Sequence, residues 1–402
     1  MPIFYFTKTG IDIEFGARHA FKMKKKGVYP KKQLTSVLIK PAGPDCNMAC
    51  TYCFYRDKEA FFPGAKIHRM SDESLEETIK QVFSQPLQAI SIGWQGGEPT
   101  LMGLPFFEKA VTLQMRYGKG KSVGNGLQTN GLLIDKDWAK FLKEYNFLVG
   151  LSLDGPEHIH NRYRLRLGGQ STWAEVVDRA KLMLGEGVEV NALVVVNDYS
   201  VRFPEEIYEF HKALGLDHMQ FIPCLETDPE DTSRAAPFSA PAEAYGDFLC
   251  RLFDLWLSDF QEGKPTTFIR YFDSLFYCYV DRDPPECDLL PECGSYVVVE
   301  HNGDVYACDF FVEERWKLGN VMERKLVHML NSGRQTEFGR LKADLPEACH
   351  ACPWLRFCRG GCPKDRLRDP HDRGLSHFCA AYKKFFAHAD ARMRKLAAEW
   401  KT

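Results

Sequence analysis

The sequence predicts an α/β fold: a partial (β/α)6 barrel of the TIM type, followed by a smaller cysteine-rich domain. Two observations support this. Between about residues 35 and 225, short apolar runs alternate with amphipathic runs of helical length, and beyond about residue 280 the alternation gives way to clustered cysteines. Short runs that are apolar throughout are typical of strands buried on both faces, as in parallel sheets.

The barrel elements follow in order along the chain. Strands are expected at 36–40, 89–94, 122–129, 147–153, 188–196 and 218–223. Helices are expected between them at 72–83, 105–117, 136–145, 173–185 and 204–214. Ser71 suits the N-cap of the first helix. Active residues of such barrels follow the C-terminal ends of the strands.

Five segments are predicted from changes in composition. They are an N-terminal extension of unknown role (1–34), the partial barrel (35–240), a bridging helix (241–280), the cysteine-rich domain (281–385) and a C-terminal helix (386–402). Within them, helical sequence is expected at 242–261 and 380–400, and a short strand at 296–300. The cysteine-rich domain contains too little helix or strand for a large core of its own, so we expect metal clusters to stabilise it.

Charge and hydropathy exclude several classes of function. The net charge is −2, which gives no bulk attraction to nucleic acid or to an anionic membrane. No apolar run reaches the ~18–20 residues of a membrane span, and no signal peptide opens the chain. We therefore expect a cytoplasmic protein. Its 14 cysteines indicate metal or redox chemistry in a reducing compartment.

The first cysteine motif follows directly on the first strand. Cys46, Cys50 and Cys53 form a C-x3-C-x-aromatic-C pattern. Three thiolates that hold a four-iron cluster leave one iron open, and that iron can chelate the amino and carboxylate groups of S-adenosylmethionine (SAM). The alternatives are packed cysteines or part of a zinc site, although a structural zinc site takes four ligands.

This motif on this barrel resembles the radical SAM superfamily. The segment Gly96-Gly97-Glu98-Pro99 follows the second strand and is similar to the family's GGEP segment, whose backbone and carboxylate hold the SAM amino group. Gln128-Thr-Asn-Gly131 and Ser152-Leu-Asp-Gly155 end the third and fourth strands. They place polar side chains at the expected catalytic rim.

The C-terminal cysteines resemble the SPASM extension of radical SAM enzymes, which binds two auxiliary [4Fe–4S] clusters. The resemblance implies two ligand sets. Set I comprises Cys287, Cys293, Cys308 and Cys362, and set II comprises Cys349, Cys352, Cys358 and Cys379. With the first motif, three [4Fe–4S] clusters are expected. Zinc is the alternative for the C-x2-C pairs. Cys224, Cys250 and Cys278 are interpreted as structural.

From Val37 to Tyr382 the sequence resembles the anaerobic sulfatase-maturating enzymes. Strings such as Trp94-Gln-Gly-Gly-Glu-Pro-Thr100 and Gln220-Phe-Ile-Pro223 carry the resemblance. It implies that a 5′-deoxyadenosyl radical removes a Cβ hydrogen from a Cys or Ser residue of a sulfatase, which becomes Cα-formylglycine. The implied partners are the sulfatase polypeptide and a flavodoxin or ferredoxin as electron donor.

The same resemblance implies roles for individual residues. Asp309 corresponds to the proposed general base; a residue that caps a turn is the alternative. The SAM contacts are expected at Tyr52, Gly97, Glu98, Ser152, Arg164 and Leu225. For Arg164 the alternative is a surface arginine, and for Leu225 it is ordinary core.

Two other functions stay open at this point. Another SPASM-type enzyme would form thioethers, epimerise residues or crosslink peptides with the same architecture. A zinc-stabilised binding scaffold would have no catalytic activity.

Overall fold

The protein is described by a computed structural model that covers residues 31–64, 66–369 and 374–400. The predicted N-terminal extension therefore lies mostly outside the described residues. Lys32, near the end of this extension, contacts the C-terminal half of the chain. Its backbone N–H donates to Asn331 Oδ1 at 2.7 Å.

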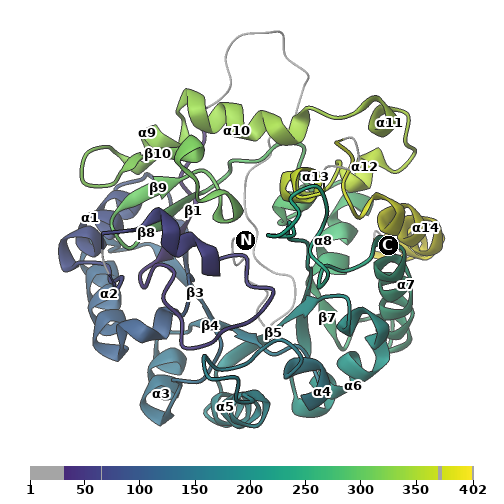
Figure 1. Cartoon of the computed structure of the whole chain (residues 1–402), viewed down its shortest axis with the longest axis horizontal. Coiled ribbons are helices and arrows are strands. Elements are labelled where there is room, and N and C mark those ends of the chain that lie inside the picture. Colours follow the sequence, from purple (N-terminus) through teal and green to yellow (C-terminus); the bar gives the residue numbers. More distant parts are fainter. Residues whose placement is uncertain (1–30, 65, 370–373, 401–402) are drawn as a thin grey trace.

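Each predicted barrel strand is present and pairs in parallel with the next. The strands are β1 (Ser36–Lys40), β2 (Ala89–Trp94), β3 (Ser122–Thr129), β4 (Leu148–Ser152), β5 (Glu189–Val196), β6 (His218–Pro223) and β7 (Phe268–Ile269). They form an open arc in this order, with helices on its outer side (Figure 1). The two-residue strand β7 was not predicted, because so short a run carries no periodic signal.

The barrel helices also lie where the sequence predicts them. They are α1 (Asp72–Phe83), α2 (Leu104–Tyr117), α3 (Lys136–Glu144), α4 (Glu157–His160), α5 (Trp173–Gly185) and α6 (Pro204–Leu214). Ser71 caps α1 as predicted, since its side chain accepts a hydrogen bond from the backbone N–H of Ser74 at 3.2 Å. The one-turn helix α4 was not predicted.

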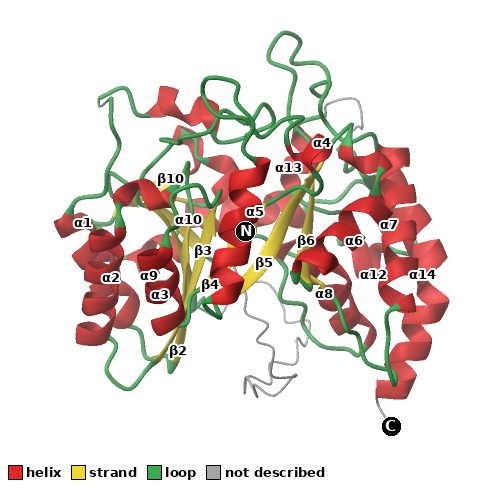
Figure 2. Cartoon of the chain, turned by 90° about the horizontal axis from the view of Figure 1, so that it is seen from below, coloured by secondary structure: helices red, strands yellow, loops and turns green. Residues whose placement is uncertain are grey.

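The first part of the predicted bridging segment is helical as expected, and a second helix follows within it. The region contains α7 (Ala242–Ser258), strand β7 and α8 (Arg270–Tyr279). The break falls at a polar turn in which Glu262 has a positive φ of 49°. Later in the chain, α14 (Cys379–Trp400) runs through the predicted boundary at 385/386 and lies along α7 (Figures 1 and 2).

The C-terminal part continues the barrel sheet, which the sequence did not predict. Strand β8 (Val297–Glu300) pairs in parallel with β1, and β9 (Asp304–Tyr306) and β10 (Lys317–Asn320) follow in antiparallel pairing. The remaining helices are α9 (Leu326–Leu330), α10 (Gly333–Ala343), α11 (Glu347–His350), α12 (Leu355–Cys358) and α13 (Pro363–Leu367). One hydrophobic core runs through both parts, so the cysteine-rich region shares the core of the barrel.

The pairing of β8 with β1 positions the site. It places Glu300 directly opposite Lys40, at the C-terminal end of β1. Of the helices in the described residues, none is long and apolar enough to cross a membrane.

Candidate active site and cluster sites

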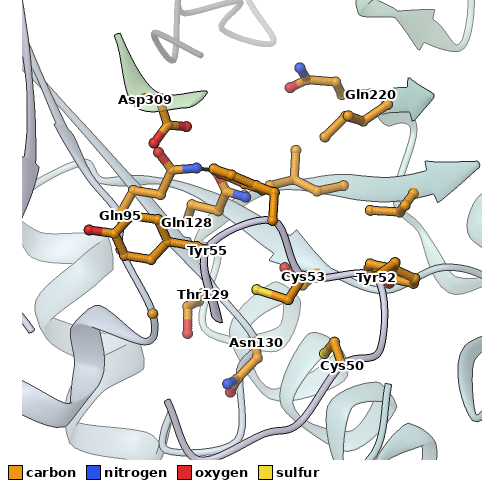
Figure 3. A pocket seen from close by; sticks show the side chains of 18 of the residues that line it. Cys50, Tyr52, Cys53, Tyr55, Gln95, Gln128, Thr129, Asn130, Gln220 and Asp309 are labelled. Carbon is orange, nitrogen blue, oxygen red and sulfur yellow. Dashed lines mark hydrogen bonds between the residues drawn. The ribbon is translucent and has the colours of Figure 1, made fainter. Parts of the chain in front are cut away.

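A cavity of about 180 Å³ opens at the C-terminal ends of the barrel strands. The three cysteines of the first motif, Cys46, Cys50 and Cys53, line it. Side chains from the strand ends and from the C-terminal part complete the wall. Figure 3 shows Asp309, Gln95, Gln128 and Tyr55 gathered on one side of this pocket, with Cys50 and Cys53 beyond them.

Gly96, Gly97 and Glu98 of the loop after β2 line the cavity. A Cβ atom at Gly97 would lie 2.0 Å from a backbone oxygen, that of Asp45, so only glycine fits there. The Glu98 carboxylate accepts hydrogen bonds from the N–H and hydroxyl of Thr100, the hydroxyl of Thr129 and the N–H of Asn130. It therefore ties the loop after β2 to the loop after β3. Among the described residues its Oε2 accepts from the Asn130 N–H alone, so the carboxylate keeps acceptor capacity on the cavity that Gly96, Gly97 and Glu98 line.

Arg164 is a buried cation and not a surface arginine. Its Nε lies 3.0 Å from Asp154 Oδ2, and its guanidinium lies 5.4 Å from the centre of the Tyr52 ring. The Tyr52 hydroxyl donates to the same carboxylate. Burial would lower the pKa of Arg164, but Asp154 raises it above its usual value. Tyr52, Ser152 and Arg164 all line the cavity, so a cation and two hydroxyls face it together.

Leu225 differs from the other expected SAM contacts. It is fully buried, and the cavity wall is formed instead by its neighbours Cys224 and Glu226. The structure thus places Leu225 in the core behind the wall. Cys224, which the sequence suggested to be merely structural, faces the cavity.

Asp309 lies in the cavity wall and is 1% exposed. It forms an ion pair with Lys40, which is fully buried and lies 3.4 Å from the centre of the Tyr55 ring. The Tyr55 hydroxyl donates to Glu300 at 2.5 Å. Burial would raise the pKa of Asp309, but Lys40 counteracts this and the pKa lies below its usual value. Asp309 is therefore an ionised carboxylate, able to accept a proton.

The cysteines of the C-terminal part gather in two places. Cys349, Cys352, Cys358 and Cys379 of set II line one small cavity of about 30 Å³. In set I, burial raises the pKa of Cys287 and of Cys362, and Cys293 and Cys308 raise both further, so these thiols lie within electrostatic reach of one another. Each proposed set is thus brought together by the fold.

Comparison with known proteins gives the family. Residues 41–211 match the radical SAM superfamily, and residues 291–353 match an iron–sulfur cluster-binding domain. A serine-type anaerobic sulfatase-maturating enzyme of Bacteroides thetaiotaomicron is 38% identical over 369 residues, which cover 88% of both chains. A cysteine-type enzyme of Clostridium perfringens is 39% identical over 366 residues, or 90% of this chain and 98% of the relative. The chain belongs to the anaerobic sulfatase-maturating enzymes.

A solved structure supports the family assignment at the level of the fold. Native anSMEcpe with bound AdoMet and Cp18Cys peptide matches with a TM-score of 0.83 and 39% identity, over 90% of this chain and 99% of that one. As a member of the sulfatase-maturating enzyme family, the protein is a radical SAM oxidoreductase that uses SAM and iron–sulfur clusters.

The thiols of this maturating enzyme fit such clusters. All 14 cysteines are free of disulfide bonds. Within the described ranges, no three His, Cys, Asp or Glu side chains converge closely enough to bind a single metal ion. The match of residues 291–353 to an iron–sulfur cluster-binding domain favours clusters over the zinc alternative.

Sequence reasoning missed two functional features of the maturase site. Lys40 ends the predicted strand at 36–40, and a lysine at the C-terminal end of a buried barrel strand is itself a signal of a site. Gln95 was also missed: its amide donates to Gln128 Oε1 at 2.8 Å, and its own oxygen is buried without a hydrogen-bond partner in the described part of the chain. That oxygen faces the cavity side occupied by Asp309 (Figure 3).

Proposed function

We propose that this enzyme oxidises a Cys or Ser residue of a sulfatase polypeptide to Cα-formylglycine. One observation carries the proposal: the buried, ionised carboxylate of Asp309 opens on the same cavity as the three cysteines of the first motif. Relatives named as cysteine-type and serine-type are almost equally similar, at 39% and 38% identity. We therefore propose both residue types as candidate targets.

The proposed cluster ligands are the three sets described above. Cys46, Cys50 and Cys53 would hold the cluster that binds SAM, and sets I and II would each hold one auxiliary cluster. When bound, these groups supply a 5′-deoxyadenosyl radical that removes a hydrogen atom from the substrate Cβ, and an acceptor for one further electron. In support, the SAM-facing wall offers the Gly96–Gly97 backbone, the Ser152 hydroxyl and the Arg164 guanidinium, which suits a carboxylate.

The chain's own contribution to the chemistry is proton transfer. For a Cys target, Cβ loses one hydrogen atom, the sulfur loses its proton and one electron leaves, which yields a thioaldehyde. Water then converts the thioaldehyde to the aldehyde and releases hydrogen sulfide. We propose that Asp309 accepts the thiol proton. A Cys thiol, with a pKa near ~8.5, is easier to deprotonate than the hydroxyl of a Ser target.

Substrate positioning is assigned to the side of the cavity opposite the first motif. The buried oxygen of Gln95 is an acceptor for a peptide N–H, because leaving a buried amide oxygen unpaired costs free energy. Gln128 holds the Gln95 amide in place. A peptide bound there would present its target side chain to Asp309.

Two finer points complete the proposal. The electron donor would be a flavodoxin or ferredoxin, the carriers suited to one-electron exchange with iron–sulfur clusters. The enzyme would work in the cytoplasm, where reducing conditions keep thiols such as its 14 free cysteines available as ligands.

Mass spectrometry of a modified peptide tests the proposal. The reconstituted enzyme is incubated anaerobically with SAM, a reductant and a peptide of about 18 residues, long enough to fill a groove, that carries a Cys-x-Pro-x-Arg motif. Replacement of the thiol sulfur by an aldehyde oxygen is expected. Formation of 5′-deoxyadenosine with an unmodified peptide would refute this substrate and favour another SPASM-type modification.

Asp309→Asn tests the base. We expect full iron content and SAM cleavage, with aldehyde formation slowed by about 10²–10⁴-fold, the range of general base catalysis. Asp304→Asn is the matched control, since Asp304 is also buried and also bound to a lysine, Lys317 at 2.8 Å, but lies outside the cavity wall. An equal loss in both variants would contradict the assignment of Asp309.

A further inference from the structure

Two buried cations of the C-terminal part have no role in the chemistry described so far. Lys342 of α10 is fully buried, and its ammonium donates to the backbone carbonyls of Asp288 at 2.8 Å and Gly361 at 2.5 Å. Arg366 of α13 is 7% exposed, and its guanidinium donates to the backbone carbonyls of Gly360, Leu341, Asp344 and Lys342 at 2.9–3.2 Å. Across the described residues, no carboxylate lies within 4.0 Å of either cation.

Buried charges in proteins are normally paired with an opposite charge, because removing an ion from water is costly. Carbonyl dipoles satisfy the N–H groups of Lys342 and Arg366 but do not neutralise them. The fold therefore buries two positive charges whose counter-charge has to come from elsewhere in their surroundings.

The two cysteine sets supply that surrounding. Asp288 directly follows Cys287 of set I, and Gly361 directly precedes Cys362 of set I. Lys342 thus joins two backbone segments that carry set I ligands. The same Gly360–Gly361 turn follows Cys358 of set II, so the cations lie where the two sets meet.

Arg366 makes the matching contact beside set II. Its guanidinium Nε donates to the Gly360 carbonyl at 2.9 Å, two residues after Cys358, and its Nη2 donates to the Lys342 carbonyl at 3.0 Å. The two cations therefore lie next to each other, between backbone segments that carry ligands of both sets.

We propose that Lys342 and Arg366 are the shared counter-charges of the two auxiliary clusters and raise the reduction potentials of both. The proposal rests on the proposed function, since it takes sets I and II as the cluster ligands. Four thiolates give such a cluster a net negative charge, and net charge is one of the factors that set its potential. A fixed positive charge favours the reduced, more negative state, which suits a pair that accepts an electron from the substrate.

Asp288, an anion near set I, allows a test of the sign of the predicted shift in reduction potential. The Asp288 carboxylate lies beside set I, with its Oδ1 3.7 Å from Cys287 Sγ, so its negative charge acts there in the opposite sense to Lys342. Removing the charge of Asp288 should therefore raise the potential of the set I cluster. A purely structural role for these residues would not produce shifts of opposite sign.

The experiment is a redox titration of the full reconstituted chain, followed by electron paramagnetic resonance. In Lys342→Met, we expect the equilibrium constant for reduction of both auxiliary clusters to fall at least tenfold, which is about 59 mV for a one-electron couple. The cluster of the first motif should not move, and Asp288→Asn should shift set I the other way. Lys121→Met is the matched control: Lys121 also donates to two backbone carbonyls, those of Phe83 and Gln85, but it precedes β3 in the barrel.

Lys342→Arg keeps the positive charge but changes the shape of the side chain, so it tests the charge separately from the packing. Unchanged potentials in Lys342→Met at full iron content would overturn the proposal. Lys342→Met could also lose auxiliary iron. In that case, Lys342→Arg supports the proposal if it keeps its iron and the natural potentials. Loss of iron in both variants overturns the proposal and shows that Lys342 only holds the backbone together. An iron content of the natural chain far below about 12 per molecule would instead refute the three-cluster assignment itself.

Discussion

The ion pair between Lys40 and Asp309 permits a quantitative prediction for Lys40→Met. Both side chains are buried, at 0% and 1% exposure. Breaking a buried pair from one side costs about 3–5 kcal/mol, and a desolvated cation–π contact such as that of Lys40 with Tyr55 is worth about 2 kcal/mol. Methionine packing offsets part of this, and Asp309 has a further interaction that limits the loss. We expect a net destabilisation of about 4 kcal/mol.

The corresponding change in melting temperature follows from the size of the chain. Unfolding entropy of about 2.1 cal/mol/K per residue over 402 residues gives about 0.8 kcal/mol/K for one cooperative unit with a shared core. A loss of about 4 kcal/mol therefore lowers the melting temperature by about 5 °C. Anaerobic differential scanning calorimetry of the reconstituted enzyme measures it.

A double-mutant cycle with Asp309→Asn decides whether the ion pair is the cause. Each single variant leaves one charge buried without this partner, whereas the double variant leaves neither. The double variant should therefore lose about 2–3 kcal/mol less than the sum of the two single losses. Additive losses would show that the two residues stabilise the fold independently, and the reasoning from the ion pair would then be wrong.

Three further predictions use other parts of the structure. Gly97→Ala should weaken SAM binding at least tenfold in equilibrium dialysis, because its Cβ would lie 2.0 Å from a backbone oxygen, whereas Gly185→Ala, with no atom within 4 Å of its Cβ, should bind SAM normally. Burial lowers the pKa of His160 to about 3, below its unfolded value near ~6.5, so the folded state resists protonation. The free energy of unfolding therefore falls by about 1.4 kcal/mol per pH unit as the pH drops below ~6.5. His160→Gln should reduce this slope in denaturant unfolding measured as a function of pH. Cys293→Ala should lose about four irons per chain in an iron assay, while Cys278→Ala should lose none.

The sequence alone determined the order of strands β1–β6 and of the longer barrel helices, with bounds within one residue of those observed. Buried parallel strands and amphipathic helices differ in hydrophobic period, and caps such as Ser71 mark helix starts, so local pattern was sufficient. The cysteine motifs likewise indicated clusters, because ligand type and spacing are local properties. The short strand β7 and the helix α8 were missed; β7 has only two residues and depends on its pairing with β6.

Only the tertiary structure decided how the site is assembled. The run of β-branched residues Val297–Val299 is typical of a strand but does not identify its partner, and its pairing with β1 brings Glu300 opposite Lys40. The ion pair of Lys40 with Asp309, the internal hydrogen bonds of Glu98 and the place of Lys342 between the two cysteine sets all join residues far apart in the chain. The sequence shows which chemical groups are present at each position. Which side chains they contact depends on which distant segments pack together in the shared core.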